Sequence, residues 1–212
     1  MNTKVKVLII RFSSIGDIVL TTPVIRCLKK QLDGEVELHY VTKKQFKPIL
    51  EGNPYLTKIH TINKSTNEII DELKNENFDY VIDLHRNLRS HRVKKALETL
   101  NFSFDKLNWQ KWLIVNFKIN KLPSIHIVDR YLNVCKALGV KNDNGGLDYF
   151  FAEELNIDKL LPDKVNKDYL AVVLGANHAT KRPTFVQYSK IVEESKDNIV
   201  LIGGKEDYEV GY

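Results

Sequence analysis

The sequence predicts an α/β protein built on a Rossmann-like, doubly wound parallel sheet. Short apolar runs rich in Val and Ile recur along the chain, as at Val5 to Ile10 and Phe78 to Leu84, and such runs are typical of strands buried on both faces. Helical patterns alternate with these runs over short links, which favours right-handed crossovers in a parallel sheet. The 43% hydrophobic and 28% charged content is that of an ordinary globular protein.

The first strand leads into a polar turn and then a helix. The helix is expected from Asp17 to Leu32, with Pro23 marking a kink or a late start. Ligands of open α/β sheets bind outside the carboxyl ends of the strands, so Asp17 should stand at the mouth of a cleft. Asp17 is therefore the first candidate for chemistry, and the alternative is that it only caps the helix or favours its dipole.

The following elements continue the alternation. Asp33 and Gly34 end the first helix, and Gly52-Asn53-Pro54 stops a later one. The expected strands are Glu35 to Thr42, Lys58 to Ile62 and Phe78 to Leu84, and the expected helices are Lys43 to Glu51, Asn67 to Asn77 and Ser124 to Leu138.

The stretch from Asn101 to Lys121 is less regular and places Trp109, Trp112 and Phe117 among lysines. An amphipathic stretch of Trp and Lys can lie against a membrane surface. A helix packed on its own domain is the preferred interpretation.

Three regions are predicted: a Rossmann-like domain at 1–154, a polar, lysine-rich linker at 155–168 and the start of a second α/β domain at 169–212. In the last region, strands at Tyr169 to Leu174 and Asn198 to Ile202 flank a helix at Thr184 to Ser195. Two strands and one helix do not bury a core of their own. The chain is therefore expected to be a fragment of a longer protein.

Positive charge is concentrated in one part of the chain. From Arg86 to Lys121, nine basic residues stand against two acidic ones, a net +7 where the whole chain carries +5. Such a patch attracts phosphates, acidic sugars or a lipid surface, although it is equally explained as a solvated helix face. Nucleic-acid binding is disfavoured because no usual recognition motif is present.

The remaining composition indicates a cytoplasmic protein without a metal. Cys27 and Cys135 have no ligand spacing and are interpreted as reduced thiols. The six histidines are scattered, which suggests no metal site. No apolar run approaches the ~18 residues of a membrane span, and no signal peptide is predicted.

A second polar group follows the strand that ends at Leu84. His85 to Ser90 should lie at the same sheet edge as Asp17, and Asn87 and Arg89 there are suited to grip a phosphate or carboxylate. The turn at Asp17 has one glycine, so it is neither a dinucleotide fingerprint nor a P-loop. A hydride-transfer enzyme or an NTPase is therefore disfavoured.

These motifs resemble those of glycosyltransferase family 9, the heptosyltransferases of lipopolysaccharide core synthesis. The specific match is R-F-S-S-I-G-D-I-V-L-T-T-P, from Arg11 to Pro23. Weaker matches in family order are E-G-N-P-Y-L (51–56), D-Y-V-I-D-L-H-R-N-L-R-S (79–90), D-R-Y-L (129–132), G-A-N-H-A-T-K-R-P (175–183) and I-G-G-K-E-D (202–207).

The resemblance implies a GT-B architecture of two Rossmann-like domains, the acceptor on the first and the nucleotide-sugar on the second. It implies an inverting transfer without metal or cofactor, from a nucleotide-sugar donor such as ADP-heptose to an anionic glycolipid acceptor. Asp17 would be the base that takes the proton of the acceptor hydroxyl, and Lys181 would contact the donor's phosphates. The other implied substrate contacts are Ser14, Gly16, Asn87, Arg89, Arg130 and Thr180.

Two departures from the family pattern limit the expectation. Arg182 abuts Pro183, so the turn after Lys181 is one residue shorter than usual. The later part of the donor domain is also missing, so the chain by itself is expected to transfer no sugar. The alternative function is a non-catalytic module that binds anionic sugars or phosphate. The expected location is the cytoplasm, with contact at the inner face of the cytoplasmic membrane left open.

Overall fold

The protein is described by a computed structural model for residues 4–154, 156, 161, 165, 168–176 and 178–210. The chain divides into two compact units, Met1–Glu154 and Leu155–Tyr212. Most of the predicted linker at 155–168, and the last two residues of the chain, lie outside the described residues. Each unit is described by itself.

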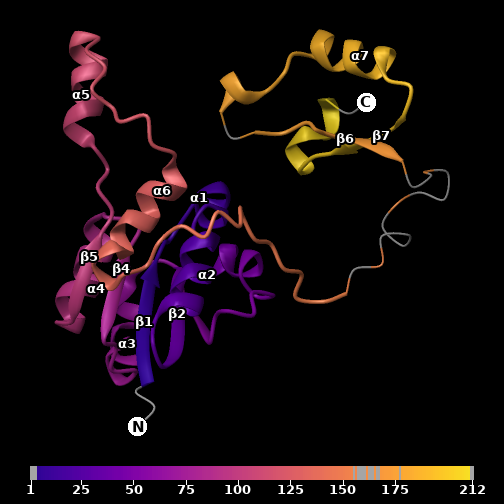
Figure 1. Ribbon diagram of the computed structural model, residues 1–212. Helices are drawn as coiled ribbons and strands as arrows, with labels where there is room; N and C mark the ends of the chain where they lie inside the picture. The colour runs from indigo at the N-terminus through magenta and orange to yellow at the C-terminus, as the bar shows by residue number, and fades with distance from the viewer. Residues whose placement is uncertain are drawn as a thin grey trace. The chain divides into compact units, whose positions relative to one another are not determined.

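Unit 1 is organised around a five-stranded parallel sheet of order β3-β2-β1-β4-β5. The sheet confirms the predicted α/β class, with the first strand at its centre (Figure 1). Its strands are β1 (Lys4–Ile10), β2 (Glu35–Lys43), β3 (Lys58–Ile62), β4 (Tyr80–Asp83) and β5 (Leu100–Ser103).

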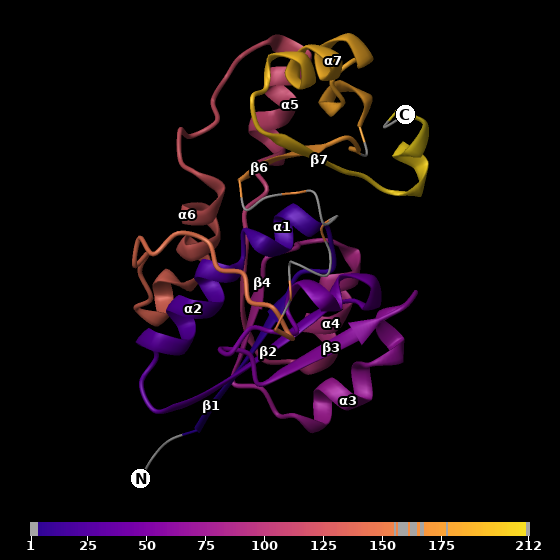
Figure 2. The same ribbon diagram turned by 90° about the vertical axis from the view of Figure 1, so that its right-hand side faces the viewer.

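Side chains of β1 alternate between two apolar cores. Val7 and Ile9 belong to one core, Leu8 and Ile10 to the other, and all four are fully buried. The first core is completed by α2 (Thr22–Gln31) and α6 (Ile127–Leu132), and the second by α3 (Ile70–Asn75) and α4 (Leu88–Leu97). Figure 2 shows these two pairs of helices on opposite faces of the sheet. Burial on both faces explains why β1 is apolar throughout its second half.

Several predicted helices are broken into shorter pieces. The expected helix from Asp17 to Leu32 is α1 (Ile15–Val19) followed by α2, with Pro23 in the first turn of α2. Proline suits that position because the N–H it lacks would have no partner there, so the late start is the correct alternative. The other breaks give η1 (Lys44–Ile49), η2 (Thr66–Glu68) before α3, and η3 (Asn133–Leu138) after α6.

In residues 101–121 one strand was not predicted and one prediction is wrong. The stretch includes most of β5, an edge strand of four residues that is too short and too polar to show a period. It also contains α5 (Asn108–Phe117), which buries none of its residues. The interpretation of this segment as a helix packed on its own domain is therefore contradicted.

Unit 2 contains a parallel pair of strands, β6 (Tyr169–Val173) and β7 (Asn198–Ile202), joined through η5 (Ala179–Lys181) and α7 (Phe185–Glu194). It ends in η6 (Lys205–Val210). Its core is small and includes Tyr188. The Tyr188 hydroxyl donates to the carbonyl of Leu174 at 2.8 Å. None of the helices in the described parts of the chain is long and apolar enough to cross a membrane.

Candidate active site

The turns after β1 and β4 lie next to each other at the carboxyl edge of the sheet. Ile10 is the register partner of Asp83, the last residue of β4. Beyond the strands, Arg11 Nη1 donates to the carbonyl of Leu84 at 2.6 Å. The two polar turns therefore lie side by side, as the parallel order of the strands predicts.

Asp17 lies in α1 and forms a capping box with Ser14, the N-cap residue. Its Oδ2 accepts from the Ser14 hydroxyl at 3.0 Å and from the Ser14 backbone N–H at 3.3 Å. The same oxygen lies 2.5 Å from Arg11 Nη2. The side chain is 38% exposed, so the carboxylate is paired and yet open to solvent.

Arg11 is the residue at this edge that the sequence motifs did not single out. It is 8% exposed, and its Nε donates to the carbonyl of Ser13 at 2.7 Å. Its guanidinium lies 5.8 Å from the centre of the Tyr131 ring. With the bond to Leu84, Arg11 therefore ties together the ends of β1 and β4, α1 and α6.

The charge of Arg11 sets the ionisation of Asp17. Partial burial favours the neutral acid, but the Arg11 guanidinium and the hydrogen bonds from Ser14 outweigh it and lower the pKa of Asp17 below its usual value. Asp17 is consequently an ionised carboxylate at neutral pH. All hydrogen bonds that the described residues give it go to Oδ2, which leaves Oδ1 to receive a proton from a substrate.

One further cation, Lys106, and a neutral histidine, His85, lie near Arg11 at this edge. Burial, together with the charges of Arg11 and Lys106, lowers the pKa of His85 to about 4, so the imidazole is neutral. Burial and the charge of Arg11 also lower the pKa of Lys106. The buried Nδ1 of His85 has no hydrogen-bond partner among the described residues. An anion bound here would relieve the repulsion between the cations.

Asn87 and Arg89 begin α4 at this edge, as predicted. Asn87 is the N-cap: its Oδ1 accepts from the Ser90 N–H at 2.9 Å, and the Ser90 hydroxyl accepts from the Asn87 N–H at 2.9 Å. This capping explains Asn87 without a ligand. Arg89 is exposed, and no hydrogen bond or ion pair to it is found within the described ranges. Arg89 is therefore available to an anion in solution.

The remaining predicted contacts of unit 1 differ in character. Arg130 donates from Nη2 to the carbonyl of Asp105 at 2.7 Å and lies over the Phe104 ring at 4.8 Å. It also lines a cavity of about 280 Å³ with Phe104, Leu107 and Ile125, and its contact with substrate stays a prediction. A Cβ at Gly16 would meet no atom within 4 Å, so internal packing does not demand glycine there.

In unit 2, Thr180 and Lys181 belong to η5 and are exposed. A hollow of about 380 Å³ lies at the carboxyl ends of β6 and β7, lined by Gly175, Gly203 and Arg182 among others. Neither Thr180 nor Lys181 lines this hollow, whereas Arg182, which the motif reading passed over, does. A Cβ at Gly175 would lie 2.0 Å from Asp207 Oδ2, so a larger residue there would displace the Asp207 carboxylate.

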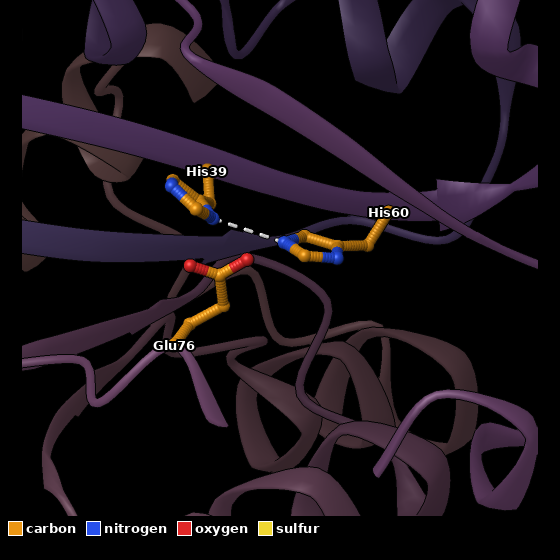
Figure 3. Close-up of side chains that lie close together, drawn as sticks. All are labelled: His39, His60 and Glu76. Carbon is orange, nitrogen blue, oxygen red and sulfur yellow. Dashed lines mark hydrogen bonds between the residues drawn. The ribbon is translucent and has the colours of Figure 1, made fainter. Parts of the chain in front are cut away.

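A histidine pair that appears scattered in the sequence is brought together on β2 and β3. His39 Nδ1 lies 3.0 Å from His60 Nε2, and Glu76 stands beside them (Figure 3). Potential ligand atoms of the three residues lie within 4.8 Å of one another. The second nitrogen of His60 bonds Glu72 at 2.8 Å, and Glu76 pairs with Lys58 at 2.8 Å. His60 and Glu76 are engaged by their own neighbours, which fits a hydrogen-bond chain better than an open metal site.

Comparisons with known proteins agree on one family. The sequence profile of glycosyltransferase family 9 (heptosyltransferase) matches residues 67–211. A curated relative, lipopolysaccharide heptosyltransferase 1 of Campylobacter coli, is 26% identical over 199 residues, covering 83% of this chain and 56% of the relative. The chain thus spans about half the length of that relative.

Solved structures share the fold. A family 9 glycosyl transferase from Veillonella parvula superposes with a TM-score of 0.75 at 20% identity, covering 96% of this chain and 64% of that one. The E. coli heptosyltransferase WaaC with ADP gives a TM-score of 0.70 at 18% identity, covering 97% and 69%. Because the family profile covers more than half of the residues and its solved members carry the same fold, this chain belongs to glycosyltransferase family 9, the heptosyltransferase family.

Proposed function

We propose that the chain serves an inverting, metal-independent transfer of a heptose-like sugar from a nucleotide-sugar to a lipopolysaccharide core or a related acceptor in the cytoplasm. The observation that carries the proposal is Asp17, an ionised, solvent-open carboxylate at the carboxyl edge of the sheet in a family 9 protein. The heptose donor is proposed because the curated relative is a lipopolysaccharide heptosyltransferase.

In the proposed reaction, Asp17 Oδ1 takes the proton of an acceptor hydroxyl as its oxygen attacks the anomeric carbon of the donor sugar. The bond from that carbon to the departing diphosphate breaks, and the nucleotide leaves with the bonding electron pair. Arg11 and Ser14 hold the other oxygen, which aims the carboxylate and keeps it ionised between turnovers. General bases of this kind accelerate reactions by about 10²–10⁴.

The basic groups of the same edge favour an anionic acceptor. Arg89 is exposed, and Lys106 is held close to Arg11 with a lowered pKa. Phosphate or carboxylate groups on the acceptor would offset this charge. In unit 2, Lys181 would contact the donor's phosphates and Thr180 would lie beside them, while Arg182 faces the hollow at the strand ends.

The test replaces Asp17 by Asn in the longest natural protein that contains this sequence. Turnover of ADP-heptose with a lipopolysaccharide acceptor is expected to fall by about 10²–10⁴, with acceptor binding retained because the side chain keeps its size. Glu51→Gln is the matched control, since Lys47 in the same surface turn is the ion-pair partner of Glu51 among the described residues, and it should leave turnover unchanged.

Turnover of Asp17→Asn at the wild-type rate would show that Asp17 is not the base. A wild-type protein that binds the acceptor tightly and releases no nucleotide would instead support the alternative of a non-catalytic module. That alternative is favoured by one observation, the Arg11 pairing that lowers the basicity of Asp17.

A further inference from the structure

The helix α5 of unit 1 exposes large apolar side chains to solvent. None of its ten residues is buried, although Gln110, Leu113 and Ile114 are half-buried. Trp109 is 65% and Trp112 is 45% exposed. The chain that returns from it to α6 continues to expose apolar side chains, including Ile119 and Ile125. Figure 1 shows α5 at the end of an excursion from the sheet of unit 1. Residues 106–126 are called the α5 arm below.

The sheet of unit 1 does not need this arm to cover it. One face is packed by α2 and α6 and the other by α3 and α4, so the exposed apolar side chains are not a missing part of the core. Contiguous exposed apolar surface of this kind marks an interaction site.

The two sides of α5 differ in chemistry. Trp109 stacks on Trp112 with ring centres 4.9 Å apart, and Phe117 meets Trp112 edge-on at 5.2 Å. At 100° per residue, Lys111 and Lys118 fall on the opposite side of the helix from this aromatic cluster, and the exposed Val115 lies beside Lys111. An aromatic side facing away from lysines is the pattern of a helix that lies in a lipid–water interface.

The positive charge of the α5 arm favours binding to an anionic surface. Four lysines lie between residues 106 and 126, and no Asp or Glu occurs there. Lys111, Lys118 and Lys121 are all exposed. Trp rings are favoured at the headgroup level of bilayers, and lysines near an anionic leaflet are attracted to its phosphates. A protein partner would have to present an acidic and apolar surface together.

We propose that the α5 arm docks on an anionic phospholipid bilayer, with the aromatic cluster inserted among the headgroups and the lysines on the lipid phosphates. The inference goes beyond the proposed transfer and does not depend on it, because docking requires neither sugar nor nucleotide.

The chain carries its own reporter for this contact. Its only two tryptophans are Trp109 and Trp112. The experiment adds vesicles of phosphatidylglycerol and phosphatidylethanolamine and follows Trp emission and co-sedimentation. We expect a blue shift of the emission, binding that weakens as salt is raised and little binding to phosphatidylcholine vesicles.

Matched variants locate the surface. Lys111→Gln/Lys118→Gln/Lys121→Gln retains both tryptophans and should weaken vesicle binding by about 100-fold, at about fivefold for each lysine. The control Lys44→Gln/Lys64→Gln/Lys74→Gln removes the same charge from exposed sites elsewhere in unit 1 and should reduce binding far less.

A second pair of variants tests the apolar contribution. Trp109→Ser/Trp112→Ser should reduce co-sedimentation by about tenfold or more, whereas Phe185→Ser/Val186→Ser, which removes exposed apolar side chains from α7, should not. These substitutions lie at exposed positions, and circular dichroism establishes that the variants are folded.

Three results would overturn the proposal. The first is an absence of blue shift and co-sedimentation with anionic vesicles at low salt. The second is equal loss of binding in the lysine variant and its control, which would place the contact elsewhere. The third is a blue shift that rises with protein concentration in the absence of lipid, which would show that a second copy of the chain covers α5.

Discussion

Arg11 is the residue on which the geometry of the candidate site depends. Its side chain is buried, yet each of its nitrogen atoms meets an acceptor: the carbonyls of Ser13 and Leu84 and the carboxylate of Asp17. A buried guanidinium is tolerated because it is paired with a carboxylate and each of its nitrogen atoms has a polar partner. The same pairing keeps Asp17 ionised and limits its strength as a base.

Replacing Arg11 by Met removes the charge that lowers the pKa of Asp17, so this pKa should rise. Partial burial, which favours the neutral acid, would then act unopposed by Arg11. The measurement is an NMR titration of the Asp17 carboxyl carbon, which needs no substrate. Arg130→Met is the control, because Arg130 contacts Asp105 and Phe104. A pKa of Asp17 that stays at its wild-type value in Arg11→Met would contradict this account.

At the scale of elements, α2 is fastened to a distant loop by Arg26. This side chain is 5% exposed and lies 2.8 Å from an oxygen of Asp143, and it also pairs with Asp148. Its Nη2 donates to the carbonyl of Gly146 at 2.9 Å. A Cβ at Gly145 would lie 2.8 Å from the same nitrogen, so a larger residue there would push against the Arg26 guanidinium.

Arg26→Met should lower the free energy of unfolding by about 2–4 kcal/mol, because two carboxylates are left facing each other without their cation. Urea unfolding followed by circular dichroism measures the change. Lys47→Met breaks an exposed pair with Glu51 and should change stability by less than about 0.5 kcal/mol. Equal effects of the two substitutions would refute the role given to Arg26.

At the scale of the molecule, the two units have separate cores of very different size. Unit 1 buries side chains on both faces of five strands, whereas the core of unit 2 consists of Val172, Leu174 and Tyr188 with Ile199 packed against them. The described histidines whose side chains are buried or half-buried, His39, His60 and His85, lie in unit 1. Burial lowers the pKa of His39 and His60, and it contributes most to the pKa of about 4 at His85.

The stability of unit 1 should therefore fall as the pH is lowered. A histidine whose pKa is lower in the folded state takes up its proton more readily when unfolded, so its stabilising effect is complete above its usual value of 6.5 and is lost as the pH falls. For His85 the loss extends from about pH 6.5 to about pH 4, at up to about 1.4 kcal/mol per pH unit.

Urea unfolding at a series of pH values measures this loss. His85→Gln should make the slope between pH 6.5 and 4 shallower, while His91→Gln, at an exposed position of α4, should leave it unchanged. A slope in His85→Gln equal to that of the wild type would show that another group takes up the proton.

Local patterns allowed most of the fold to be predicted. The strands β1, β2, β3, β4, β6 and β7 follow from apolar runs and turn residues, because burial imposes a composition that is visible in the sequence. The family was identified from the run Arg11 to Pro23 together with the weaker motifs that follow it, and the family profile matches residues 67–211. By contrast, β5 and the exposure of α5 were missed, since a short edge strand and an unpacked helix have no periodic signal of their own.

The sequence by itself determined the α/β class, the family and the sheet edge at which Asp17 lies, because parallel strands all deliver their following turns to one edge. Only the tertiary structure decided what surrounds that carboxylate. Four features depend on the tertiary structure: the pairing of Asp17 with Arg11, the neutral state of His85, the contact of His39 with His60, and the exposure of α5. Such relations arise when strands and helices pack against one another, and a one-dimensional pattern does not contain them.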